Sequence, residues 1–172
     1  MKRTHTISTL FLLSILSIFE GCGGCPYSFS GSSVPPHLKT IAVPYSDDKS
    51  GSGEAGLRET FTQKLTQKFI DDNSLRVTER NTADAILETT ITSVNDAPSV
   101  ITSGTTVSTR RITITVNAVF RDMVKKKVVF EKQFSNFGEY SGSLGRDARD
   151  AAIKKALDNI TEDILLDTIS GW

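Results

Sequence analysis

The chain has 172 residues, of which 38% are hydrophobic and 23% charged, and its 20 basic and 20 acidic side chains cancel. This composition fits one folded domain with its own core and argues against a disordered chain. The balance of charges gives no electrostatic reason to expect binding to nucleic acid.

The first 21 residues have the layout of an export signal. Two basic residues precede an apolar run at 10–19, which is far shorter than the about 20 apolar residues that span a bilayer. Gly21 then precedes Cys22, and a small residue before a cysteine at this place is typical of bacterial lipoprotein signals. We therefore expect a signal peptide over 1–21 and a lipid on Cys22, which tethers the chain to a membrane without embedding it.

Cys25 is the alternative attachment site, because Gly23 and Gly24 also bring small residues up to a cysteine. Cys22 is favoured since it lies closer to the apolar run. An ordinary cleaved signal with two free cysteines is a third interpretation. The two cysteines also spell C-x-x-C, but neither a strand nor a helix is expected beside them, so the context favours neither a redox centre nor a zinc site.

The residue pattern of the rest of the chain predicts strands and helices in the order β-α-β-β-β-β-α. We expect a lipid-anchored tether over 22–37, rich in Ser, Gly and Pro, and a single domain over 38–172. Within this domain we expect strands at 38–45, 75–77, 84–95 and 111–122 and a returning strand from 128, helices over 54–72 and 146–169, and loops at 46–53, 95–109 and 138–145.

The apolar residues of both predicted helices recur at helical spacing and form one stripe on each. The stripes are Leu57, Phe61, Leu65 and Phe69 in the first helix and Ile153, Leu157, Ile160 and Ile164 in the second. Apolar and polar residues alternate along 111–122, as in a sheet with one covered face. The expected fold class is therefore α+β: a two-layer sandwich with two amphipathic helices on one face of a four- to five-stranded, mostly antiparallel sheet.

One glycine motif suggests a nucleotide site that its context does not favour. Gly51, Gly53 and Gly56 have the spacing G-x-G-x-x-G, and Glu79 follows. The first glycine comes too long after the preceding strand, and the chain continues as a β-meander, not as further β-α-β units. His37 is the only histidine outside the signal, which is too few for a metal cluster. We expect no enzyme activity, cofactor or metal.

Lys125, Lys126 and Lys127 form the turn of the last predicted hairpin. Charges at such a turn keep an edge soluble, and they can also contact phosphate groups on a lipid or glycolipid. Arg110 and Arg111 begin the preceding strand, so they belong at the opposite end of the hairpin, where a second basic patch is an open alternative.

Several short motifs follow one another along the mature chain. They are YSFSG at 27–31, LKTIAVPY at 38–45, DAIL at 84–87, RRITITVNAVFRD at 110–122 with its lysine-rich turn, and Trp172 after the last helix. In this order they resemble the LptE family of outer-membrane lipopolysaccharide-assembly lipoproteins. The resemblance implies a small, non-catalytic α/β plug, anchored by lipid such as palmitate in the outer membrane and facing the periplasm. It also implies help in assembling a large LptD-like β-barrel and binding of lipopolysaccharide during transport to the surface.

The resemblance places the lipid on Cys22, or alternatively on Cys25. Lys125, Lys126 and Lys127 are the candidates for contact with lipopolysaccharide, on charge alone. The expected partners are the barrel translocon, lipopolysaccharide and the membrane, and not nucleic acid. The alternative function is a periplasm-facing lipoprotein that docks on another envelope complex, such as a cell-wall synthase or a secretion pore, because a fold does not fix a function.

Overall fold

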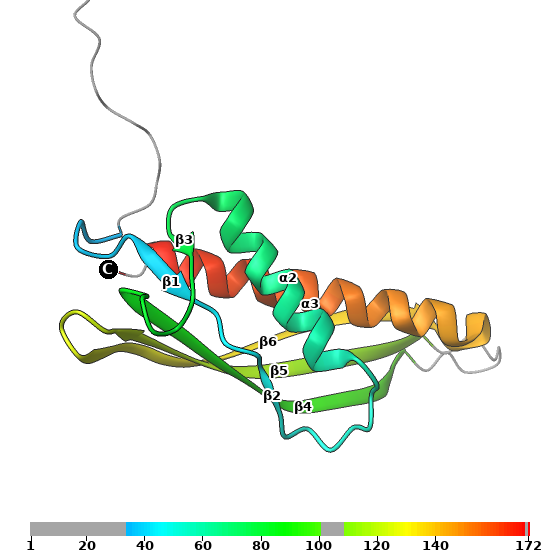
Figure 1. Ribbon diagram of the computed structural model, residues 1–172. Coiled ribbons are helices and arrows are strands. Elements are labelled where there is room, and N and C mark those ends of the chain that lie inside the picture. Colours follow the sequence, from blue (N-terminus) through cyan, green and yellow to red (C-terminus); the bar gives the residue numbers. More distant parts are fainter. Residues whose placement is uncertain (1–33, 101–108, 171) are drawn as a thin grey trace, which may run out of the picture. The chain divides into compact units, whose positions relative to one another are not determined.

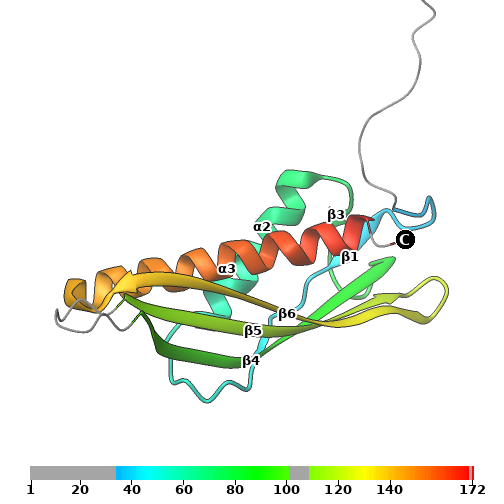
Figure 2. The ribbon, with the colours of Figure 1, turned by 180° about the vertical axis from the view of Figure 1, so that it is seen from behind.

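The computed structural model describes residues 34–100, 109–170 and 172, and in these ranges strands and helices form two layers (Figure 1). The strands are β1 (Thr40–Ala42), β2 (Asp47–Asp48), β3 (Arg76–Val77), β4 (Ala85–Val100), β5 (Thr109–Asp122) and β6 (Lys127–Ser141). The helices are α2 (Leu57–Asp72), the 3₁₀ turn η1 (Gly142–Leu144) and α3 (Gly145–Ser170). Both α-helices lie on the same face of the sheet (Figures 1 and 2), which confirms the predicted α+β sandwich.

The sheet combines a long antiparallel meander with short parallel pairings. Its strand order is β3-β1-β4-β5-β6, with β2 also paired to β4. β4, β5 and β6 pair antiparallel along most of their length. β1 and β2 pair parallel to β4, and β3 pairs parallel to β1. The parallel part arises because α2 carries the chain back between β2 and β3, as a crossover between parallel strands must.

The first predicted strand is interrupted at Pro44. The sequence predicts one strand over 38–45, whereas β1 ends at Ala42 and β2 resumes beside β4 at Asp47. Pro44 has no amide hydrogen to donate to a strand ladder. Between the two strands, buried Ser46 is held by two hydrogen bonds to side chains. Its backbone amide donates to Thr62 Oγ1 at 3.0 Å, and its hydroxyl group forms a hydrogen bond with the hydroxyl of Thr89.

Two predicted loops are partly regular structure. β4 continues to Val100 and β5 begins at Thr109, so strand replaces both ends of the loop expected over 95–109; residues 101–108 lie outside the described residues. β6 runs to Ser141 and α3 begins at Gly145, which shortens the loop expected over 138–145 to the turn η1. Polar composition suggested loops, but cross-strand pairing of Asp96 with Ile112 and of Tyr140 with Arg110 extends the ladder.

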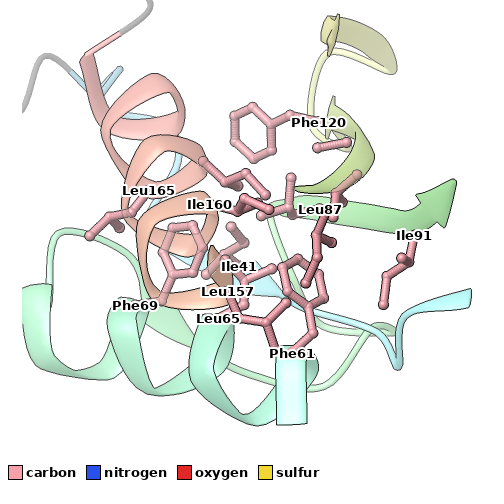
Figure 3. Packing of buried hydrophobic residues seen from close by; sticks show 14 of the residues in the cluster. Ile41, Phe61, Leu65, Phe69, Leu87, Ile91, Phe120, Leu157, Ile160 and Leu165 are labelled. Carbon is pink, nitrogen blue, oxygen red and sulfur yellow. The ribbon is translucent and has the colours of Figure 1, made fainter. Parts of the chain in front are cut away.

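The core lies between the inner face of the sheet and the two helices (Figure 3). The predicted stripes of α2 and α3 are buried, as is every second residue of β5 from Ile112 to Phe120. Phe61, Leu65 and Phe69 of α2 are fully covered and meet Leu157 and Ile160 of α3 in this core. The helical and strand periodicities read from the sequence are therefore confirmed.

Gly138 of β6 marks the place where α3 comes closest to the sheet. A Cβ atom at this position would lie 2.0 Å from the carbonyl oxygen of Ala152, which is a backbone atom that cannot turn aside. Only glycine leaves room for so close an approach of helix and strand.

Replacement of this glycine tests the packing of α3. Gly138→Ala should lower the free energy of unfolding by about 3 kcal/mol, because the helix must move off the strand. The control is Gln133→Ala at an exposed position of the same strand, where we expect a change within about 0.5 kcal/mol. Urea unfolding followed by circular dichroism measures both, and equal stability of the two variants would contradict the role given to Gly138.

Candidate functional site

The structure describes some of the predicted site residues but not all of them. Cys22 and Cys25 lie outside the described residues. Lys125 and Lys126 belong to the turn between β5 and β6, and Lys127 is the first residue of β6. All three lysines are exposed, and the salt bridges of the described residues do not include them. The predicted basic turn is therefore a real surface feature.

The same turn carries apolar side chains that the sequence analysis did not single out. Met123 is 42% exposed, Val124 54% and Val128 46%. Other large apolar residues are exposed in the described ranges, but they are scattered over several elements, whereas these three lie within six positions. We call residues 123–128 the hairpin tip: a surface on which three lysines are bracketed by apolar groups. In the sequence, the apolar residues on both sides of the three lysines could have indicated this surface.

A buried carboxylate holds the base of the hairpin tip. Asp122 is fully buried; its Oδ1 accepts a hydrogen bond from the amide of Lys125 at 2.7 Å, and its Oδ2 lies 2.8 Å from His37 Nε2. Burial alone would raise the pKa of the Asp122 carboxyl, but the Lys125 amide and His37 together outweigh it and hold that pKa below its ordinary value. One side chain thus fixes both the turn and the segment that leads into β1.

Both ends of the described chain lie near the base of this hairpin. His37 reaches Asp122, and Val34 packs against the core. At the other end the ring of Trp172 meets Phe120 edge-on at 5.7 Å, and its indole N–H donates to the carbonyl of Thr168 at 3.0 Å. The start of β1 and the C-terminus lie close together in Figures 1 and 2.

The opposite end of the meander contains a polar cavity of about 680 Å³. It is lined by residues from the segment before α2, from β5 and β6 and from the first turn of α3, among them Gly53, Glu54, Arg110, Tyr140 and Arg146. Gly53 brings the glycine-rich segment to this cavity, but that segment follows a two-residue strand in a mixed sheet. This is not the architecture of a dinucleotide site.

Two of the three arginines beside this cavity, Arg110 and Arg149, are paired with acids. Asp96 accepts hydrogen bonds from Arg110 Nε at 2.8 Å, from the Tyr140 hydroxyl at 2.8 Å and from Arg149 Nε at 3.2 Å. Arg149 also donates to Glu54 Oε2 at 2.7 Å. Burial would raise the pKa of the Asp96 carboxyl, but these donors outweigh it and lower that pKa. The network joins the sheet to the starts of both helices.

Arg110 and Arg111 consequently do not form a second basic patch. Arg110 forms a salt bridge with Asp96. Arg111 pairs with Glu139 at 2.7 Å on the other face of the sheet, and its guanidinium lies 4.0 Å from the ring centroid of Phe137. The hairpin tip and the far end of the meander therefore differ: none of the three lysines of the tip has a salt bridge, whereas at the far end only Arg146 lacks one among the described residues.

The sheet face turned away from the helices is mainly polar along its middle, where exposed Phe137 lies beside Thr113 and Asn117 donates to Glu131. Across this face β4, β5 and β6 present uncharged hydrogen-bonding groups in register: Ser93, Asn95, Thr113, Thr115, Asn117, Gln133 and Ser135. Thr115 and Ser135 lie 3.2 Å apart, hydroxyl to hydroxyl. By contrast, the outward sides of α2 and α3 carry exposed charges such as Arg58 and Lys155.

The described residues define a small α+β domain and contain no group of three His, Cys, Asp or Glu side chains that could hold a metal ion. None of the described helices has the length and apolar character needed to cross a membrane. The chain matches the family model LptE, described as lipopolysaccharide-assembly, over residues 38–168. It belongs to this family, which is not an enzyme family, so its role is in assembly and not in catalysis.

Solved structures share the fold at low sequence identity. The hypothetical protein CT253 from Chlamydia trachomatis matches with a TM-score of 0.60 at 8% identity, over 78% of this chain and 99% of that one. Protein XCC0632 from Xanthomonas campestris gives 0.58 at 16% identity, over 80% and 90%. A minor lipoprotein from Acinetobacter baumannii gives 0.52 at 12% identity, over 80% and 94%. No curated protein matches the sequence.

The buried carboxylate predicts how stability depends on pH. Because the folded pKa of Asp122 is lowered, its contribution is present above the unfolded value of about 3.9 and is lost as the pH falls through the folded pKa. Asp122→Asn should cost about 1–3 kcal/mol at pH 7, and this cost should become smaller as the pH falls below the unfolded value. Urea midpoints between pH 7 and pH 2 measure this, with Asp147→Asn in an exposed part of α3 as control. A gap that stays constant with pH would contradict the assignment.

Proposed function

We propose that this protein is an outer-membrane lipoprotein that plugs and helps assemble the β-barrel through which lipopolysaccharide reaches the cell surface, and that it binds lipopolysaccharide on the way. The observation that carries the proposal is the family match, because it spans both helices and all the described strands. In this arrangement the domain faces the periplasm and is held to the membrane by its N-terminal lipid.

The lipid anchor is proposed from the sequence of the N-terminus. Cys22 follows a short apolar run and a glycine, as a lipid-modified cysteine does after its signal peptide. Acylation there attaches the domain through the segment that enters the fold at Val34. Cys25 is the alternative site.

Contact with lipopolysaccharide is assigned to the hairpin tip. Lipopolysaccharide carries phosphate groups, and ammonium groups attract phosphates as point charges. Lys125, Lys126 and Lys127 supply three such groups at consecutive positions. At the other end of the meander all the described arginines except Arg146 are paired with Asp96, Glu54 or Glu139. The tip is therefore the better candidate of the two for an anionic ligand.

The polar sheet face supports the role of a plug. The interior of a transmembrane β-barrel is lined by polar side chains. A face of Ser, Thr, Asn and Gln groups can hydrogen-bond to such a wall without burying an unpaired charge, which would be costly. The central residues Thr113, Thr115 and Asn117 are partly buried, and none of the described helices covers them.

Affinity purification tests the barrel partnership. The tagged full chain, isolated from outer membranes, should bring down a large β-barrel of the translocon type, and its depletion should remove lipopolysaccharide from the cell surface. Recovery of a cell-wall synthase or a secretion pore, with surface lipopolysaccharide intact, would instead support the alternative of docking on another envelope complex.

Substitution of the cysteines tests the anchor. Cys22→Ala should abolish the lipid modification, because no thiol remains at the acylated position, whereas Cys25→Ala should leave it in place. Mass spectrometry of the mature N-terminus distinguishes the two outcomes. The reverse pattern would move the anchor to Cys25, and a lipid-free wild-type protein would exclude it.

Charge reversal tests the contact with lipopolysaccharide. Replacing Lys125, Lys126 and Lys127 together by Glu should weaken binding of purified lipopolysaccharide at least tenfold, since each lost attraction becomes a repulsion. The control replaces the exposed Lys154 and Lys155 of α3 by Glu. Equal loss in both variants would show that net charge matters and that the tip does not.

A further inference from the structure

The hairpin tip has a second property that phosphate contact does not explain. Its lysines are bracketed by Met123, Val124 and Val128, each more than two-fifths exposed to solvent. Such side chains gain free energy when they leave water. A loop that combines exposed basic and apolar groups matches the interfacial region of a bilayer, where phosphates lie directly above acyl chains.

The position of the tip in the fold strengthens this match. Asp122, directly before the tip, pairs with His37, so the chain enters the fold at the base of the same hairpin. Cys22 and Val34 are twelve positions apart in the sequence. A fully extended chain covers about 3.3–3.6 Å per residue, so this stretch reaches at most about 43 Å.

The far end of the domain can reach the same membrane only if the N-terminal segment is nearly fully extended. α3 runs from Gly145, beside the polar cavity, to Ser170 near the tip end, and its 26 residues at 1.5 Å each make it about 39 Å long. To set the far end on the membrane, the N-terminal segment would have to stretch almost fully along the domain. To set the tip on the membrane, it need not stretch at all.

We propose that the hairpin tip docks on the phospholipid surface of the membrane leaflet that holds the N-terminal lipid. The ammonium groups of its lysines lie among the lipid phosphates, and Met123, Val124 and Val128 enter the boundary between headgroups and acyl chains. Lipid and tip then form two attachment points and fix the orientation of the domain. This inference rests on the lipid anchor of the proposed function.

Vesicle flotation tests the docking. The probe protein is the mature chain with Cys22→Ser, so that binding does not depend on the lipid. It is mixed with vesicles of phosphatidylethanolamine and phosphatidylglycerol, with vesicles of phosphatidylcholine alone, and with phosphatidylcholine vesicles that contain lipopolysaccharide. We expect binding to the first kind and little to the second, because the lysines require anionic phosphate groups.

Paired variants separate charge from apolar insertion. The variant with Lys126→Ser and Lys127→Ser should bind about 30-fold more weakly, and that with Met123→Ser and Val124→Ser about tenfold more weakly.

The matched controls make the same kinds of substitution at exposed positions outside the hairpin tip. They are Lys154→Ser with Lys155→Ser, two exposed lysines on α3, and Leu144→Ser, an apolar residue that is 70% exposed at the far end. Both should bind like the parent chain, and circular dichroism confirms that every variant is folded.

Three outcomes would overturn the inference. They are failure to bind the phosphatidylglycerol vesicles, equal weakening in tip variants and controls, and binding only where lipopolysaccharide is present. The last outcome would leave the proposed contact with lipopolysaccharide intact. Conversely, failure to recover a barrel partner would remove the proposed function without affecting the vesicle result, so the two ideas fail separately.

Discussion

The packing of α3 across β5 and β6 is the contact on which the rest of the structure depends. This helix buries its apolar stripe against the alternate residues of β5, and Gly138 lets it lie directly on the β6 backbone. α2 joins it through the shared core and through the ion pairs of Lys64 with Asp158 and of Lys68 with Glu162. These pairs are part-exposed and add little on their own, so burial of apolar surface holds the layers together.

Because α3 spans the domain, it connects two ends with different electrostatic character. Its first turns contribute Arg149 to a network in which arginines and carboxylates satisfy one another. Its last turns lie beside the hairpin whose lysines have no such partners among the described residues. A chain with no net charge can therefore still present a local positive surface, because none of its described acids forms a salt bridge with the three lysines of the tip.

Periodicity made the helices and the central strand predictable, since each buries one face and the spacing of apolar residues reports that directly. The basic turn was also predictable, because its three lysines lie between two segments with strand patterns. The extension of β4 through Asp96 was not predictable, because a polar side chain there bonds to residues far away in the sequence. Nor was the buried role of Asp122, since nothing local distinguishes a carboxylate that pairs with His37, 85 positions away. The end of β1 at Ala42 was not predicted, since the strand was expected to continue to Tyr45, and the hydrogen bonds of Ser46 depend on residues distant in the sequence.

The pairing of distant segments has a consequence for how the protein folds. β1 pairs with β4, about 45 positions later, and the buried carboxylate that receives His37 comes later still. The helix that covers the sheet is the last element of the chain. As the chain emerges from its N-terminus, β1 thus has no strand partner until residues 76–86 follow, and His37 meets its partner only when Asp122 follows. Completion of the core is a late, non-local event, which makes the nascent chain depend on protection from aggregation until α3 arrives.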